Sequence, residues 1–132
     1  MATISEDYVS FECAKLLKEK GFAEKCRTYF KVFPKDRIAA IYHSSEDRGV
    51  SEDDPNEILC PTIQMAMKWL RKEHNLCIVP LPVVTDDDGE GGCLWKYTIS
   101  MKLKVLFDSE NLYESPEIAL DDAIKCCLEN LI

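Results

Sequence analysis

Residues 93–107 read CLWKYTISMKLKVLF, and this stretch decides the fold because apolar and polar residues alternate along it. The apolar positions are Cys93, Trp95, Tyr97, Ile99, Met101, Leu103, Val105 and Phe107, and the polar positions between them are Lys96, Thr98, Ser100, Lys102 and Lys104. A period of two predicts a β-strand with one buried face and one face in water. A single strand of this length would extend over ~50 Å, far beyond the usual strand, so we expect a bend or tight turn near Ser100–Lys104 that divides it.

Three amphipathic helices are predicted around this stretch. Ser10 is suited to cap a helix that runs from Phe11 to Lys20, and Gly21 ends it. A second helix begins at Pro61 and continues to His74, where Asn75 can adopt the left-handed conformation that ends it. Ser115 and Pro116 open a third helix that continues to Leu131, with Asp121, Asp122, Lys125 and Glu129 on its water-facing side.

Further strands are predicted between the helices. Arg27–Phe33 and Arg37–His43 form a hairpin around Pro34–Asp36, and Leu76–Val84 is a strand whose prolines favour an edge. The order of these elements predicts a single α+β domain over residues 1–132, with a mainly antiparallel sheet of about four strands and three helices packed on it. The acidic stretch from Ser44 to Glu57 is expected to be a long loop, and Thr85–Gly92 a turn.

The composition excludes several classes of protein. The chain has 132 residues, 46% of them hydrophobic and 30% charged, which is typical of one globular domain that needs no metal or disulfide to fold. No apolar run is long enough to cross a bilayer. The first eight residues include Glu6 and Asp7 where a secretory signal would be basic and then apolar. We therefore expect a cytoplasmic protein with no cofactor and no membrane contact.

Most of the net charge of −8 comes from two segments. The stretches 46–57 and 86–90 hold ten acidic residues and one base, Arg48. Charge runs of this kind are usually solvated loops, and the net charge argues against direct binding of nucleic acid. The alternative is an acidic surface that binds a basic partner or mimics DNA. Its candidate residues are Glu52, Asp53, Asp54, Asp86, Asp87 and Asp88.

The seven cysteines predict buried free thiols, since their number is odd and no secretory signal precedes them. They have no zinc-site spacing, and His74 with Cys77 is the only close His/Cys pair. Asp86, Asp88 and Glu90 match the first positions of a calcium loop, but the twelfth position is Tyr97 instead of Glu. No metal site is therefore predicted.

No catalytic signature is present either. Neither His43 nor His74 lies near a nucleophile in a recognised setting, and the glycines of residues 89–92 precede a strand where a dinucleotide loop would precede a helix. An enzyme or small-ligand binder would need a pocket lined by residues such as Tyr97, His43 or Cys93.

The second helix offers the best candidate for a protein contact. Its apolar arc spans roughly 200°, about twice the width that one sheet face requires. Met65 and Trp69 lie on its flank, and this pair of residue types is typical of contact hot spots. The alternative is that they form a second edge of the core beneath the long loop.

Residues 9–12, 14–22, 61–71, 124–125 and 127–132 of the three helices read VSFE, AKLLKEKGF, PTIQMAMKWLR, IK and CLENLI. In these segments the chain resembles a group of small uncharacterised proteins carried by gut-bacterial prophages and mobile elements. The group has no established activity, so the resemblance implies a cytosolic, mobile-element setting and assigns no catalytic residue.

Three functional hypotheses follow from the sequence. The first is a nonenzymatic protein-interaction module whose partner is another protein, with a homodimer through Met65 and Trp69 as one form of it. The second is a DNA-mimicking inhibitor of a host nucleic-acid enzyme. The third is a small-ligand binder or an enzyme.

Overall fold

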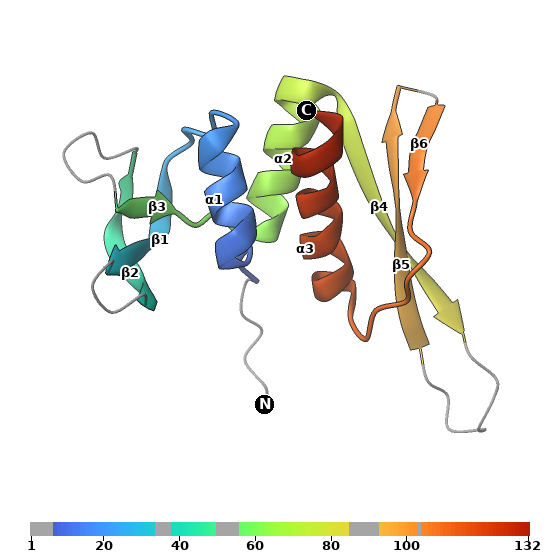
Figure 1. The fold of residues 1–132 in the computed structure, drawn as a ribbon, viewed down its shortest axis with the longest axis horizontal. Helices are drawn as coiled ribbons and strands as arrows, with labels where there is room; N and C mark the ends of the chain where they lie inside the picture. The colour runs from blue at the N-terminus through green and yellow to red at the C-terminus, as the bar shows by residue number, and fades with distance from the viewer. Residues whose placement is uncertain (1–6, 34–37, 50–55, 85–92, 103) are drawn as a thin grey trace. The chain divides into compact units, whose positions relative to one another are not determined.

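The computed structural model describes residues 7–33, 38–49, 56–84, 93–102 and 104–132. The chain divides into two compact units, residues 1–66 and residues 67–132, and the boundary falls within helix α2 (Ile63–His74). The class is α+β, as predicted. Instead of one sheet of about four strands, however, the described residues form two separate antiparallel sheets of three strands each (Figure 1).

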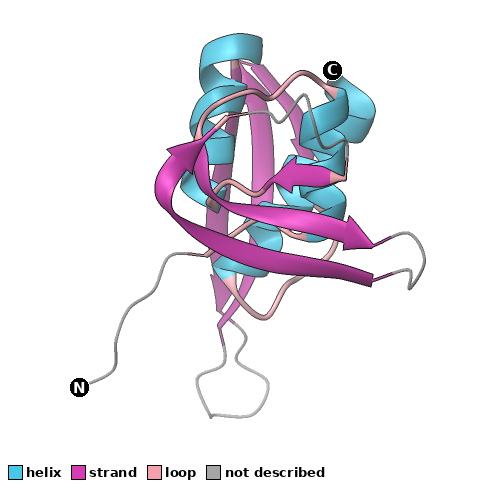
Figure 2. Ribbon diagram, turned by 90° about the vertical axis from the view of Figure 1, so that its left-hand side faces the viewer, coloured by secondary structure: helices cyan, strands magenta, loops and turns pink. Residues whose placement is uncertain are grey.

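Unit 1 contains helix α1 (Phe11–Glu19) and strands β1 (Cys26–Phe33), β2 (Ile38–Arg48) and β3 (Glu57–Leu59). The strand order is β2-β1-β3. Figure 2 shows β1 and β2 as a long, curved pair of strands. Phe11 of α1 contacts Phe30 of β1 edge to face, with 5.2 Å between the ring centroids, so the helix packs on this sheet.

The predicted hairpin is confirmed, but its second strand is longer than expected. β2 continues through Arg48, five residues into the stretch predicted as loop, because Arg48 pairs with Cys26 beyond a register shift in β1. Glu57, the last residue of that stretch, begins β3, which pairs with β1 and was not predicted. The turn at Pro34–Asp36 and residues 50–55 of the acidic stretch lie outside the described residues.

Helix α1 begins at the predicted residue and ends one residue earlier than predicted, at Glu19. The Ser10 side chain accepts a hydrogen bond from the Cys13 N–H at 3.3 Å. At the other end Gly21 has a φ of +93°, and the Phe22 N–H donates to the Leu17 carbonyl at 2.9 Å. Gly21 therefore reverses the chain in a backbone conformation that other residues adopt only with strain.

Helix α2 begins two residues later than predicted, at Ile63, because the Thr62 hydroxyl accepts from the Met65 N–H and provides the cap. It ends at His74 as predicted, with Asn75 at a φ of 58°.

Unit 2 contains strands β4 (Leu76–Val84), β5 (Cys93–Met101) and β6 (Lys104–Asp108), then helix α3 (Pro116–Cys126) and a π-helical turn, η1 (Cys127–Leu131). β4 has the predicted bounds and lies at an edge of the sheet, where its prolines leave no ladder hydrogen bond unmade. The predicted division of residues 93–107 is also confirmed: Met101 pairs with Lys104, and Lys102 has a φ of 56°.

Helix α3 begins as expected, with the Ser115 hydroxyl accepting from the Ile118 N–H at 3.1 Å. It packs against β4 and β5. The buried residues of α3, η1, β4 and β5 are Leu76, Ile78, Tyr97, Ile99, Ala119, Leu120, Ala123, Ile124, Cys127 and Leu128.

The first testable prediction concerns Gly21. Gly21→Ala is expected to lower the free energy of unfolding by about 1–2 kcal/mol, because the added methyl group meets no neighbour within 4 Å but the backbone stays at positive φ. Gly49→Ala is the matched control, since Gly49 is equally open and has no positive φ. Urea unfolding measures both, and equal midpoints for the two variants would contradict the assignment.

Candidate functional site

All three apolar side chains of strand β6 are exposed. Val105 is 61% exposed, Leu106 38% and Phe107 39%. The alternation of residues 93–107 predicts Val105 and Phe107 on a buried face, and this is wrong for β6. Phe107 pairs with the buried Ile99, but α3 contacts β4 and β5 and leaves the third strand open. Val105 pairs with Ser100 beyond a register shift, so it lies on the opposite face of the sheet. A group of neighbouring exposed apolar side chains on a strand is typical of a protein contact.

Charged residues flank this apolar centre on both sides. Lys102 and Lys104 precede it, and Asp108, Glu110 and Glu114 follow it, all exposed. We call Lys102 together with residues 104–114 the edge segment. Leu112, within the same segment, is also exposed. Along the segment the charge changes from positive to negative across an apolar centre.

The part of the edge segment after β6 is held to strand β5 by backbone pairing. The Tyr97 N–H donates to the Ser109 hydroxyl at 3.0 Å, and the Ser109 N–H donates to the Tyr97 carbonyl at 2.9 Å. Trp95 and Tyr113 exchange two backbone hydrogen bonds of 2.8 and 2.7 Å. The segment is thus fixed along the whole side of β5.

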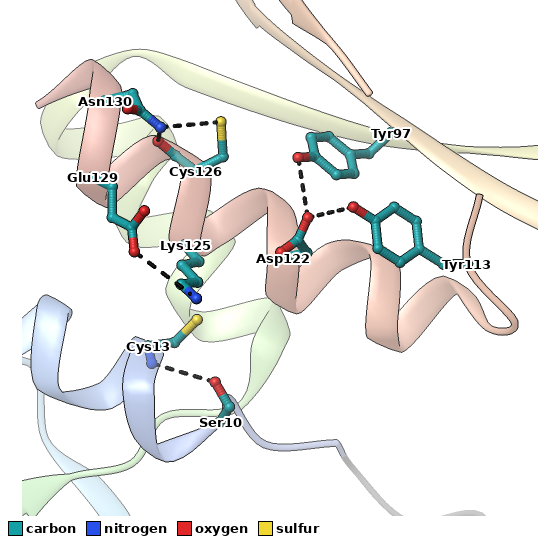
Figure 3. Close-up of polar contacts among 9 residues, drawn as sticks. All are labelled: Ser10, Cys13, Tyr97, Tyr113, Asp122, Lys125, Cys126, Glu129 and Asn130. Carbon is teal, nitrogen blue, oxygen red and sulfur yellow. Dashed lines mark hydrogen bonds and ion pairs between the residues drawn. The ribbon is translucent and has the colours of Figure 1, made fainter. Parts of the chain in front are cut away.

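A shared carboxylate ties the same segment to helix α3. The hydroxyls of Tyr97 and Tyr113 both donate to Oδ2 of Asp122, the former at 3.4 Å (Figure 3). Tyr97 also stacks against Phe107 of β6, with 6.0 Å between the ring centroids. The sequence places Asp122 on the water-facing side of its helix. In the structure the Asp122 side chain is half-buried, because Tyr113, in the loop before α3, lies next to it and donates to it.

Both phenols are kept in the donating form. Burial, followed by the nearby Asp122 charge, raises the pKa of Tyr97 well above its usual value. Burial and the hydrogen bond to Asp122 raise the pKa of Tyr113 as well. Tyr97 is 3% exposed, so this cluster positions the edge segment and offers no access to a substrate.

Unit 1 has a surface pocket of about 320 Å³. It is lined by Tyr8, Lys25, Cys26, Arg27, Thr28, Asp47, Cys60, Pro61, Thr62 and Met65. None of Tyr97, His43 and Cys93 lines it, although His43 Nδ1 lies 3.0 Å from the Thr28 hydroxyl.

Two polar groups of this pocket have partners within the chain. Arg27 pairs with Asp47 at 3.3 Å, and the Cys26 thiol donates to the Glu24 carbonyl at 3.4 Å. Burial, with smaller contributions from the Asp47 and Glu24 charges, raises the pKa of Cys26 to about 11. The thiol therefore stays protonated near neutral pH and is a poor nucleophile.

The residues predicted as a partner contact are less exposed than the edge segment. Met65 is half-buried, and Trp69 is 7% exposed with its ring edge-on to His74 at 4.9 Å between centroids. Their role in a protein contact stays a prediction. The six candidate acidic residues, at positions 52–54 and 86–88, lie outside the described residues, as does the calcium-like stretch.

All seven cysteines are free, and Cys13, Cys26, Cys60 and Cys127 are buried. Within the described ranges no three His, Cys, Asp or Glu side chains gather into a potential metal site. No helix in the part of the chain that the structure describes is long and apolar enough to span a membrane. Comparisons with protein-family models, with curated proteins and with solved structures find no match to this chain.

The second testable prediction concerns the shared carboxylate. Tyr113→Phe removes one donor to Asp122 and is expected to lower the free energy of unfolding by about 1–3 kcal/mol at pH 7. Tyr42→Phe is the control, because Tyr42 is exposed and its ring stacks on Tyr29 without a hydroxyl contact. The control is expected to stay within about 0.5 kcal/mol of wild type in urea unfolding.

Wild type and the Tyr113→Phe variant also give a test of pH dependence. The pKa of Tyr113 is raised on folding, so its stabilising effect is complete below the usual tyrosine value of 10.0 and is lost as the pH rises above it. The stability difference between wild type and Tyr113→Phe is therefore expected to be constant from pH 7 to about 9 and to shrink above about 10. A difference that persists unchanged in strong alkali would contradict the shared-carboxylate assignment.

Proposed function

We propose that the chain is a nonenzymatic protein-interaction module that binds another protein through the edge segment. The observation that carries the proposal is the exposure of Val105, Leu106 and Phe107 on a strand that α3 leaves uncovered. Removing such side chains from water by contact with a partner is favourable, roughly in proportion to the apolar area buried.

The rigidity of this surface supports the proposal. Backbone hydrogen bonds join the edge segment to Trp95 and Tyr97, and Asp122 holds the segment to α3 through Tyr113. A preformed surface loses less conformational entropy on binding than a loop that must order first. The pocket of unit 1, in contrast, has a protonated thiol, which does not suit nucleophilic catalysis.

The proposal places the module in the cytosol of a cell that carries a prophage or another mobile element. The support for this setting is the resemblance of the three helices to small mobile-element proteins. The partner is therefore sought among the proteins of a bacterial lysate and among copies of the chain itself.

The third testable prediction compares two sets of substitutions in a pull-down. Tagged wild type, the double variant Val105→Ser with Leu106→Ser, and the control Ile118→Ser are incubated with nuclease-treated bacterial lysate and with untagged copies of the chain. Ile118 is 52% exposed on α3, outside the edge segment, so the control removes comparable apolar surface. Wild type and control are expected to retain the same stoichiometric protein, and the double variant to lose at least nine tenths of it.

All three proteins must show the same thermal midpoint, which separates loss of contact from loss of fold. Retention of every bound protein by the double variant would overturn the proposal.

A further inference from the structure

We propose that the partner at the edge segment is a second copy of the chain, so that the protein forms a two-fold symmetric dimer. This inference rests on the proposed function and names its partner. In a two-fold contact the same surface occurs on both sides and must complement itself, so the charges and apolar groups of the segment can be tested against that requirement.

The charged residues of the edge segment meet this requirement around Leu106. Lys104 lies two residues before Leu106 and Asp108 two residues after it, while Lys102 and Glu110 lie four residues away on either side. When two copies run antiparallel about Leu106, each lysine opposes a carboxylate of the other copy. The contact therefore brings together four pairs of opposite charges and no pair of like charges.

Among the described residues, these charges have no ion-pair partner. None of Lys102, Lys104, Asp108 and Glu110 forms an ion pair with another residue that the structure describes. All four are exposed, so they reach a partner without a large desolvation cost.

The apolar residues lie at the centre of the same symmetry. An antiparallel contact centred on Leu106 joins the two Leu106 side chains. Because Phe107 pairs with Ile99 and Val105 with Ser100, the contact places both Phe107 side chains on one face of the joined edges and both Val105 side chains on the other. An apolar centre bordered by charged residues is the usual arrangement of a protein interface. Both the charged and the apolar residues of the edge segment therefore complement those of a second copy.

The contact is made by side chains more than by a continued β-ladder. The pairing of β5 with β6 shifts register between Ile99 and Ser100, which leaves Leu106 as the extra residue of a bulge. A bulge interrupts regular pairing along an edge and re-aims the side chain at its centre. The opposite edge, β4, carries Pro80 and Pro82, which lack N–H donors, so β6 is the edge better suited to a partner.

The fourth testable prediction is made by sedimentation of the full chain at increasing concentration. A segment of this length gives a small interface, so a dimer with a dissociation constant in the range of about 1–100 µM is expected at low salt. Raising the salt from about 50 to 500 mM is expected to weaken the dimer roughly tenfold, because the opposing charges are exposed and screened.

The fifth testable prediction reverses the charges on either side of Leu106. Lys102→Glu with Lys104→Glu makes the segment acidic throughout, and Asp108→Lys with Glu110→Lys makes it basic throughout. Each variant alone is expected to sediment as a monomer, since like charges then oppose one another. An equimolar mixture is expected to form a one-to-one heterodimer at least as tight as the wild-type dimer. The control Lys25→Glu, an exposed charge in unit 1, leaves dimerisation unchanged.

A wild-type monomer at every concentration would overturn the inference, and so would a dimer that survives both charge reversals or a mixture that does not associate. These results are distinguishable from failure of the proposed function. If wild type is monomeric and binds a different protein that the double variant Val105→Ser with Leu106→Ser does not bind, the interaction module stands and the second copy is excluded as its partner. If the same substitutions release neither a copy of the chain nor any other protein, both proposals fail.

Discussion

A single α-helix lies on the sheet of residues 67–132, and its width decides which strands it covers. An α-helix with its side chains is about 10–12 Å across, whereas neighbouring strands are about 4.8 Å apart, so one helix covers two strands. Helix α3 lies on β4 and β5, where Tyr97 and Ile99 are buried. The third strand, β6, follows in the sheet order and stays open. The exposure of Val105, Leu106 and Phe107 is therefore a consequence of the architecture of this unit, and the proposed interaction surface depends on it.

The segment that follows the open strand is nevertheless held in place by polar contacts with α3. Asp122 accepts from Tyr97 of the sheet and from Tyr113 of the segment that follows β6. Burial raises the pKa of both phenols, so both remain donors over the physiological range of pH. A half-buried carboxylate with two such donors retains its hydrogen bonds without water. The result is a surface that is exposed and ordered at once, a combination suited to binding without a large entropic cost.

Much of the secondary structure can be predicted from the sequence, because its signals are local. Ser10 and Gly21 mark the ends of α1, the prolines mark β4 as an edge strand, and the length of the alternating stretch requires the turn at Lys102. Pairing between distant segments gives no such signal. The three residues of β3 are too few to show a period, and they form a strand only because β1 lies beside them. The prediction of one sheet instead of two has the same cause, since alternation identifies a strand but not its neighbour.

The candidate site, too, can be predicted from the sequence only in part. The symmetric charges around Leu106 are visible in the sequence, but the alternating pattern places Val105 in the core. Its exposure follows from the register shift beside Leu106, which the sequence does not show. The most direct test is hydrogen–deuterium exchange of the full chain at low and high protein concentration. The account predicts that the amides of residues 104–108 become more protected at high concentration while those of β4 do not change. Protection that is independent of concentration, or that rises on β4 and not on β6, would contradict it.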